Sequence, residues 1–331
     1  MTGNSLATYT RARRSKVATP HVTLKAGKFR RESFTRYVSR NHPLYVMLIP
    51  CILFFIVFKY VPIMGSIIAF QDYKIFEGIL KSEWVGFKWF EQLFSYPQFT
   101  RLIGNTLLIS FYQLIFSFPA PIILAVLLNE IRSSGFKRTI QTIVYLPHFL
   151  SWTIIFGFVY MLLSPQTGMI NGLIADMGFE KIHFLQNNEY IRSIIVGSGV
   201  WKEMGWSSII FLAAIAGINP SLYEAARIDG ASRWKQFLHV TFPGVLAAVV
   251  ILLLLKIGHL LDLGFEQIYI FLTPANFSVA DVLDTYTYRI GIKNGQYSLT
   301  TAIGFFKSII GFSLLVVANR MSKWLTGEGL Y

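Results

Sequence analysis

The sequence has little cysteine and little charge, and both shortages restrict what the protein can be. Only one of its 331 residues is cysteine, Cys51, so an intrachain disulfide and a cysteine-based zinc cluster are excluded. Charged residues make up 14% of the chain, whereas soluble domains carry about 25%. Hydrophobic residues make up 53%, and the mean hydropathy is +0.51. Such a chain would expose apolar surface in water, so the composition predicts an integral membrane protein.

The motifs of nucleotide hydrolysis and of common hydrolases are also missing. Neither GxxxxGK[ST] nor GxGxxG occurs, so no loop that cradles phosphate is predicted. HExxH and GxSxG are absent as well, and the six histidines are scattered singly. We therefore expect a protein that is not an enzyme, has no catalytic residue, binds no metal and carries no cofactor of its own.

The chain does contain a series of long apolar runs. A helix needs roughly 20 residues to cross a hydrocarbon core of about 30 Å. The fourth run is interrupted by charged residues, but six stretches reach the required length: 44–62, 103–128, 140–163, 191–217, 245–263 and 299–318. The sequence thus predicts an all-α membrane protein with six transmembrane helices.

The first 42 residues differ from the rest of the chain. They hold ten Lys/Arg and one acid, Glu32, so most of the net charge of +13 lies in this segment. This distribution argues against a nucleic-acid partner and favours a basic tail at the surface of the lipid bilayer. With the tail inside, cytoplasmic segments collect eighteen Lys/Arg and outer loops seven, as the positive-inside rule requires. We expect 1–42 to be a basic cytoplasmic tail, 43–331 to be the membrane domain, and both termini to be cytoplasmic.

The most informative segment is the predicted cytoplasmic loop between the fourth and fifth helices. Asn219 is a good helix N-cap, and Gly230 can adopt the left-handed conformation that ends a helix, which predicts a helix over 221–229. A second short helix is expected after Ser232, closed by Pro243 before the fifth span. Two short helices joined at Gly230 would form a knob beneath the membrane.

The composition of this knob favours a protein partner. Small side chains make one face smooth enough for close approach, and charged side chains around them can pair across an interface. The residues concerned are Glu224, Ala225, Ala226, Arg227, Asp229, Gly230 and Arg233. The alternative is an ordinary amphipathic connector without a partner.

The loop resembles the EAA loop of ABC importer permeases, whose pattern is E-A-A, three residues, G, nine residues, I-x-L-P. Residues 224–226 read E-A-A, and Gly230 and Pro243 follow at the required spacing. Val240 and Phe242 stand where the pattern has Ile and Leu, and both differences are conservative. The resemblance implies that the loop couples the chain to ATPases.

Weaker similarities extend from about residue 43 over most of the chain and resemble the branch of these permeases that imports oligo- and polysaccharides. They lie at 62–73, 84–87, 105–106, 146–147 and 327–331. An importer of alginate or of another uronate oligomer is one candidate within this branch. Two alternatives are an ABC permease for peptides or amino acids and a secondary transporter driven by an ion gradient.

The resemblance also implies a set of partners and a location. Such a permease pairs with a second, homologous permease and with two ABC ATPase subunits, which bind ATP and Mg. An extracytoplasmic solute-binding protein delivers the saccharide. The expected location is the bacterial cytoplasmic (inner) membrane, with several spans.

Polar side chains within the predicted spans are candidates for a substrate path, because an ionisable group in hydrocarbon is costly unless it faces a cavity or a partner. Lys256 and His259 are three residues apart in the fifth span and should share a face, which predicts an acidic saccharide as cargo. The alternative to a role in substrate binding is that Lys256 and His259 pair with groups on a neighbouring helix or on the sister subunit. Hydrogen bonding and aromatic stacking also hold sugars, and further candidates on this basis are Asn105, Tyr112, Gln113 and Trp152, unless they only pack helices together.

Overall fold

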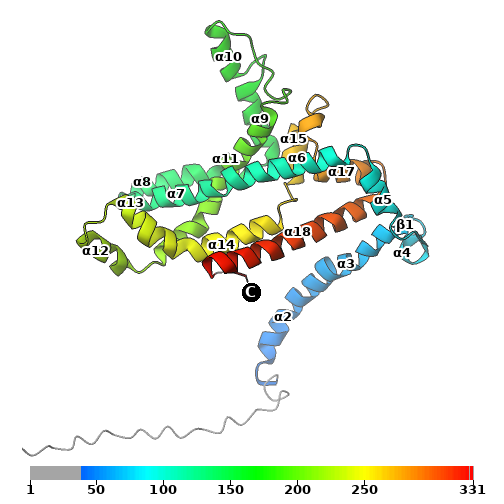
Figure 1. The fold of residues 1–331 in the computed structure, drawn as a ribbon, viewed down its shortest axis with the longest axis horizontal. Helices are drawn as coiled ribbons and strands as arrows, with labels where there is room; N and C mark the ends of the chain where they lie inside the picture. The colour runs from blue at the N-terminus through cyan, green and yellow to red at the C-terminus, as the bar shows by residue number, and fades with distance from the viewer. Residues whose placement is uncertain (1–38, 328, 331) are drawn as a thin grey trace, which may run out of the picture. The chain divides into compact units, whose positions relative to one another are not determined.

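The computed structural model describes residues 39–327, 329 and 330 (Figure 1). The predicted basic tail, 1–42, lies almost entirely outside these residues, as do Glu328 and Tyr331 of the terminal motif. The chain divides into two compact units, Met1–Val61 and Pro62–Tyr331. The second unit contains both the predicted coupling loop and the predicted substrate path.

The first unit contributes an apolar helix. α2 (His42–Phe55) has Pro43 in its first turn, where the missing N–H costs nothing, and continues into the π-helical turn η1 (Ile56–Tyr60). No described residue of these two elements is buried within the chain. Helical structure continues across the unit boundary, so that His42–Phe70, 29 residues, is long and apolar enough to cross a membrane. The predicted span 44–62 lies inside it.

A small folded segment precedes the second candidate span. The indole N–H of Trp89 donates to the carbonyl of Gln71 across 2.9 Å and ties the segment together. A two-residue antiparallel ladder here is a departure from the all-α prediction. The elements are α3 (Val61–Gly65), η2 (Ser66–Phe70), β1 (Gln71–Asp72), α4 (Gly78–Lys81), β2 (Glu83–Trp84) and α5 (Lys88–Ser95).

Helices make up the rest of the second unit. In Figure 1, α14 and α18 run side by side, α12 and α5 lie at opposite ends of the unit, and α9 and α10 project from it. The elements are α6 (Phe99–Tyr112), η3 (Gln113–Ser117), α7 (Pro119–Glu130), α8 (Ser134–Tyr145), η4 (Leu146–Phe149), α9 (Trp152–Leu163), α10 (Met169–Asp176), α11 (Ile191–Ala216), α12 (Pro220–Ile228), α13 (Arg233–Gln236), η5 (Phe237–Thr241), α14 (Phe242–Gly258), α15 (Phe265–Phe271), α16 (Phe277–Ala280), α17 (Leu283–Tyr288), η6 (Arg289–Lys293) and α18 (Tyr297–Thr326).

The described residues contain four to six candidate membrane spans. Four are continuous helices: His42–Phe70, Phe99–Glu130, Arg233–Gly258 and Tyr297–Thr326. Two more are pairs of helices with a sharp bend between them: Ser134–Phe149 with Trp152–Leu163, at 106°, and Ile191–Ala216 with Pro220–Ile228, at 71°. The described residues are therefore mostly helical, and each predicted run overlaps one of these helices or bent pairs.

The third span is broken, which makes the prediction of one continuous helix over 140–163 wrong. Pro147 has no N–H to continue the hydrogen-bond ladder, and it lies in the short 3-10 segment η4. The chain then turns by 106°, and the hydroxyl of Ser151 accepts from the N–H of Ile154 to begin α9. At 12 residues, α9 is only about 18 Å long, too short to cross a bilayer alone.

Lys202 of α11 stabilises the break. Its ammonium donates to the carbonyls of His148 and Leu150 at 2.7 and 2.6 Å, two backbone groups that a continuous helix would have satisfied itself. Glu203 accepts from His148 at 3.0 Å, and Trp206 stacks on the same imidazole with ring centroids 4.6 Å apart. One face of α11 thus holds the broken segment in place.

Removing the Lys202 ammonium should destabilise the protein without changing its surface. In Lys202→Met, two half-buried carbonyls lose a charged donor, and we expect the free energy of unfolding to fall by about 2 kcal/mol. Thermal unfolding of the purified protein in lipid nanodiscs measures this loss. Lys181→Met, at an exposed lysine, is the matched control. Equal stability of the two variants would show that Lys202 does not hold the break.

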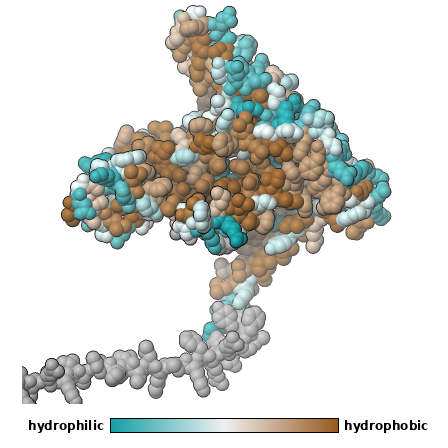
Figure 2. All heavy atoms as spheres, viewed as in Figure 1, coloured by the Kyte–Doolittle hydropathy of each residue, from teal (hydrophilic) through white to brown (hydrophobic). Residues whose placement is uncertain are grey.

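Three apolar clusters form the core of the second unit. One joins α6, α11 and α15 through Ile109, Ile195 and Phe271. The others join α5, α6, α17 and α18, and α7, α11 and α14. Figure 2 shows hydrophobic residues over the middle of this unit and hydrophilic residues near its α12 and α5 ends. An apolar belt between two hydrophilic ends is typical of a protein that spans a membrane.

Candidate functional site: the coupling loop and the Lys256 cavity

The predicted coupling loop folds around α12. The side-chain oxygen of Asn219 accepts from the N–H of Ser221 at 3.0 Å and caps the helix, as predicted. Gly230 has φ of 72°, the left-handed conformation in which a helix ends, and the next N–H, of Ala231, donates to the carbonyl of Ala226 at 2.8 Å. The first short helix and its glycine turn are therefore as predicted.

The second half of the loop differs from its prediction. Ser232 caps the next helix, but Pro243 does not close it. Instead Pro243 lies in the first turn of α14, where a proline is tolerated, and helical structure runs from Arg233 to Gly258 without a break. α12 is thus attached to a long, stiff helix through the turn at Gly230.

The seven residues predicted to couple the chain to a partner lie on or beside α12. Ala226 is half-buried and the other six are exposed. Arg233 is already paired within the chain, 2.8 Å from the carboxylate of Glu130 in α7. A polar cleft of about 700 Å³ separates α12 from α7 and α13, and it is lined by Asn129, Glu130, Arg132, Pro220, Tyr223, Glu224, Arg227, Arg233, Gln236, Phe237 and Thr241.

A cavity of about 440 Å³ within the helices contains three of the predicted path residues, and we call it the Lys256 cavity. Its lining is Gln113, Ser117, Phe118, Pro121, Trp152, Gly199, Glu203, Ser207, Ile210, Phe211, Leu252, Lys256, Asp262, Leu263, Gly264 and Gln267. Aromatic, amide, hydroxyl and charged groups converge here. This is the set of groups that holds a polar organic ligand such as a sugar.

The sequence did not predict that Glu203, Asp262 and Gln267 would join this cavity. Gln267 follows a reversal of the chain at Gly264, which has φ of 83°, and no periodicity in the sequence signals that re-entry. Its amide donates to the carbonyl of Ile195 at 2.6 Å and accepts from Gln113 at 3.5 Å. The available signal was a lone glycine, Gly264, followed three residues later by the polar side chain of Gln267.

Lys256 and His259 do not line the same cavity, although they were predicted to share a helix face. α14 ends at Gly258, and His259 is the first residue after it, with its backbone N–H still donating to the carbonyl of Leu255 at 3.3 Å. His259 lines a second cavity of about 440 Å³, which we call the Lys307 cavity, formed by Gly258, His259, Asp262, Gly304, Lys307, Ser308 and Gly311. Asp262 contributes to both cavities.

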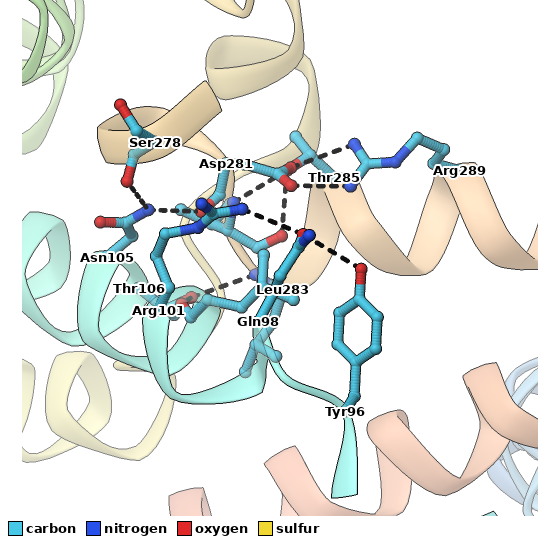
Figure 3. A network of polar contacts seen from close by, with 12 residues as sticks. Tyr96, Gln98, Arg101, Asn105, Thr106, Ser278, Asp281, Leu283, Thr285 and Arg289 are labelled. Atoms are coloured by element: carbon cyan, nitrogen blue, oxygen red, sulfur yellow. Dashed lines mark hydrogen bonds and ion pairs between the residues drawn. The ribbon is translucent and has the colours of Figure 1, made fainter. Parts of the chain in front are cut away.

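Asn105 lies in a buried polar network, as Figure 3 shows. Its amide donates to the carbonyls of Ser278 and Asp281 at 3.2 and 3.0 Å, and its oxygen accepts from Arg192 at 2.8 Å. These contacts account for its hydrogen-bonding groups. Tyr112 lines a separate groove between α6 and α11.

The same network continues to the end of α17. The carboxylate of Asp281 accepts from Arg289 at 2.7 Å and from Thr285 at 2.8 Å (Figure 3). Hydrogen bonding to Asp281 raises the pKa of Arg289 above its usual value. Burial raises the pKa of Tyr286 to about 12, so its phenol stays neutral throughout the physiological range. The network fixes α6, α11, α16 and α17 to one another.

Several apolar spans, two bent pairs and polar cavities between the helices define a multi-span membrane protein of the transport type. The family model "Binding-protein-dependent transport system inner membrane component" matches residues 117–327. This chain belongs to that family. The family is an inner-membrane one, and its transport depends on a binding protein, which decides against a secondary transporter driven by an ion gradient.

Individual relatives match almost the whole chain. Over 288 residues, the chain is 49% identical to the polygalacturonan/rhamnogalacturonan transport system permease protein YteP of Bacillus subtilis (strain 168), covering 87% of this chain and 90% of that one. It is also similar to a structure of a bacterial ABC transporter involved in the import of the acidic polysaccharide alginate, with a TM-score of 0.81, 40% identity, and coverage of 88% of this chain and 99% of the other.

A second solved structure adds a partner. It is a bacterial alginate ABC transporter in complex with an alginate pentasaccharide-bound periplasmic protein. The TM-score is 0.82 at 40% identity, covering 90% of this chain and 99% of that chain. The fold described above is therefore the fold of a subunit in a sugar transporter of known structure.

Proposed function

We propose that this chain is the permease subunit of an ABC importer that moves an acidic oligo- or polysaccharide into the cytoplasm. The observation that carries the proposal is its likeness, over nearly its whole length, to a polygalacturonan permease and to alginate transporters. Polygalacturonan and alginate are both polymers of uronic acids. Transport of peptides or amino acids, the alternative cargo, has no such support.

The proposed membrane arrangement has six spans, with the two bent pairs each counting as one. Both termini and the α12 loop lie on the cytoplasmic side, and α5 lies on the outer side. The exposed residues of α12 and its polar cleft supply a surface for ATPase subunits, which bind ATP and Mg. A second permease and an outer solute-binding protein complete the complex. The opposite placement of α12 and α5 in the second unit supports this orientation.

In the proposed mechanism, the chain transmits a movement and lines a path. ATP binding closes the ATPases, and their movement shifts α12. The turn at Gly230 passes that movement to the continuous helix Arg233–Gly258, which carries Lys256 near its far end. The Lys256 cavity then opens outward to receive saccharide from the binding protein, and hydrolysis of ATP returns it to the inward-facing state.

Lys256 is the residue that favours an acidic cargo. Among the described residues, no carboxylate lies within ion-pair distance of its ammonium. The other two charged groups of the cavity each have a partner: the carboxylate of Glu203 accepts a hydrogen bond from His148 at 3.0 Å, and Asp262 lies 2.6 Å from the ammonium of Lys307. A uronate carboxylate that loses water on entering the cavity would find its compensating charge at Lys256.

The test compares Lys256→Gln with the wild type in proteoliposomes that contain the whole transporter. We expect the KM for transport of tetragalacturonate to rise roughly tenfold, since one charge-assisted hydrogen bond is lost. The KM for the carboxyl-reduced tetrasaccharide, which is neutral and of equal length, should stay unchanged. Lys81→Gln, at an exposed lysine of α4, is the control. An equal loss with both sugars would make Lys256 a structural residue.

A further inference from the structure

Asp262 lies between two cavities and is a charged obstacle for an anionic cargo. It follows α14 in the turn 259–264 and lines both the Lys256 cavity and the Lys307 cavity. Its side chain is 59% exposed. A carboxylate that reaches either cavity therefore meets a second negative charge, the carboxylate of Asp262.

Lys307 of α18 opposes that charge. Its ammonium lies 2.6 Å from the carboxylate of Asp262 and also contacts Asp284 of α17. The Lys307 side chain is only 13% exposed: it forms part of the wall of the Lys307 cavity, and its ammonium is paired with two carboxylates. Asp284 accepts the N–H of Leu263 at 3.2 Å, which fixes the turn that carries Asp262.

The two carboxylates differ in what they face. Asp262 lines both cavities, whereas Asp284 lines neither and its side chain is 18% exposed. One ammonium shared by two carboxylates leaves the group with a net negative charge, part of which lies at the cavity surface on Asp262. The negative charge of this group that a cargo can meet in the cavities is therefore the one on Asp262.

We propose that Lys307 and Asp262 set the specificity of the path for acidic saccharides: Lys307 offsets the charge of Asp262, and so permits an anionic sugar to enter the cavities that Asp262 lines. The proposal rests on the proposed function, because it concerns the same cargo. Lys307 acts through Asp262 and is a positioning residue. Asp262 is the group that the cargo meets.

The first experiment uses Asp262→Asn, which keeps the shape of the side chain and leaves Lys307 paired with Asp284. In proteoliposomes with the whole transporter, we expect the ratio of transport efficiency for tetragalacturonate over its carboxyl-reduced counterpart to rise about threefold or more, since a like charge is removed. Asp284→Asn is the matched control. It has the same ammonium partner but lines no cavity, so it should change both sugars by the same factor.

A second experiment removes the ammonium of Lys307, which offsets the charge of Asp262. Lys307→Met should lower the efficiency for tetragalacturonate roughly tenfold more than for the neutral sugar, and Asp262→Asn in the same chain should restore the ratio. If Lys307→Met does not assemble, the comparison of Asp262→Asn with Asp284→Asn decides alone. Two results would overturn this proposal alone: an unchanged ratio in Asp262→Asn, or no rescue in the double variant. In both cases the wild type still takes up tetragalacturonate, so the proposed function stands. A wild type that takes up only the neutral sugar overturns the proposed cargo and this proposal together.

Discussion

Gly230→Pro is expected to leave the chain in the membrane and to separate it from its ATPases. Gly230 has φ of 72°, whereas proline is restricted to a φ near about −65°. The substitution also removes the N–H that donates to Arg227 at 3.1 Å. α12 would then leave its position relative to Arg233–Gly258, although no span is touched. We expect the amount of ATPase that co-purifies with the chain to fall by about tenfold or more.

Charge reversal at Glu224, on the exposed surface of α12, should also reduce the amount of ATPase that co-purifies with the chain, but through electrostatics rather than backbone geometry. Glu224 is exposed on α12 and lines the polar cleft, so Glu224→Lys changes the charge offered to a partner without disturbing the fold. Controls with the same chemistry exist in the loop that follows α10, away from α12: Gly178→Pro, at φ of 83°, and the charge reversal Glu180→Lys. Undiminished ATPase binding and transport in both α12 variants would contradict the coupling role.

Gly205→Ala is expected to be the most destabilising single-methyl change in the chain's membrane region. A Cβ at Gly205 would lie 1.9 Å from the carbonyl oxygen of Val144 and 2.5 Å from its carbon. Both contacts are with backbone, so no side-chain rotation relieves them, and α8 would have to leave α11. Because the clash is with backbone, we expect a loss of about 3 kcal/mol or more in the free energy of unfolding, at the upper end for overpacked sites.

A matched control lies on the same helix. Gly197→Ala places a Cβ where no atom lies within 4 Å, and alanine has the higher helix propensity. Thermal unfolding of both variants in nanodiscs therefore separates the close approach at Gly205 from the general effect of replacing a helical glycine. If Gly205→Ala unfolds at the temperature of Gly197→Ala, the helices do not approach as closely as described.

Patterns within short stretches of sequence predicted the elements whose formation depends only on neighbouring residues. Length and apolarity predicted runs that overlap the candidate spans, and Asn219 and Gly230 mark the ends of α12, because capping and left-handed turns involve only neighbouring residues. The break in the third span was not predicted. Pro147 in an apolar stretch is compatible with a mild kink, and the contact that makes a 106° turn stable comes from Lys202, more than fifty residues away.

The candidate path could be predicted only in part for a related reason. Gln113, Trp152 and Lys256 stood out as polar or aromatic groups in apolar runs, and the fold brings all three to one cavity. The separation of His259 from Lys256 depends on where α14 ends. The sequence around Gly258 contains no capping pattern strong enough to predict that helix end. Side chains that join the cavity through a reversal of the chain, such as Asp262, need the tertiary fold to be recognised.

The support that Lys202 gives to the broken span has a consequence for biogenesis. The chain is made from its N-terminus, so residues 134–163 reach the membrane before α11 has been synthesised. Until then, the carbonyls of His148 and Leu150 lack the ammonium that satisfies them in the folded protein, and unsatisfied backbone groups are costly in lipid. We expect this segment to wait at the insertion machinery and to enter the bilayer together with α11, as one hairpin-like unit.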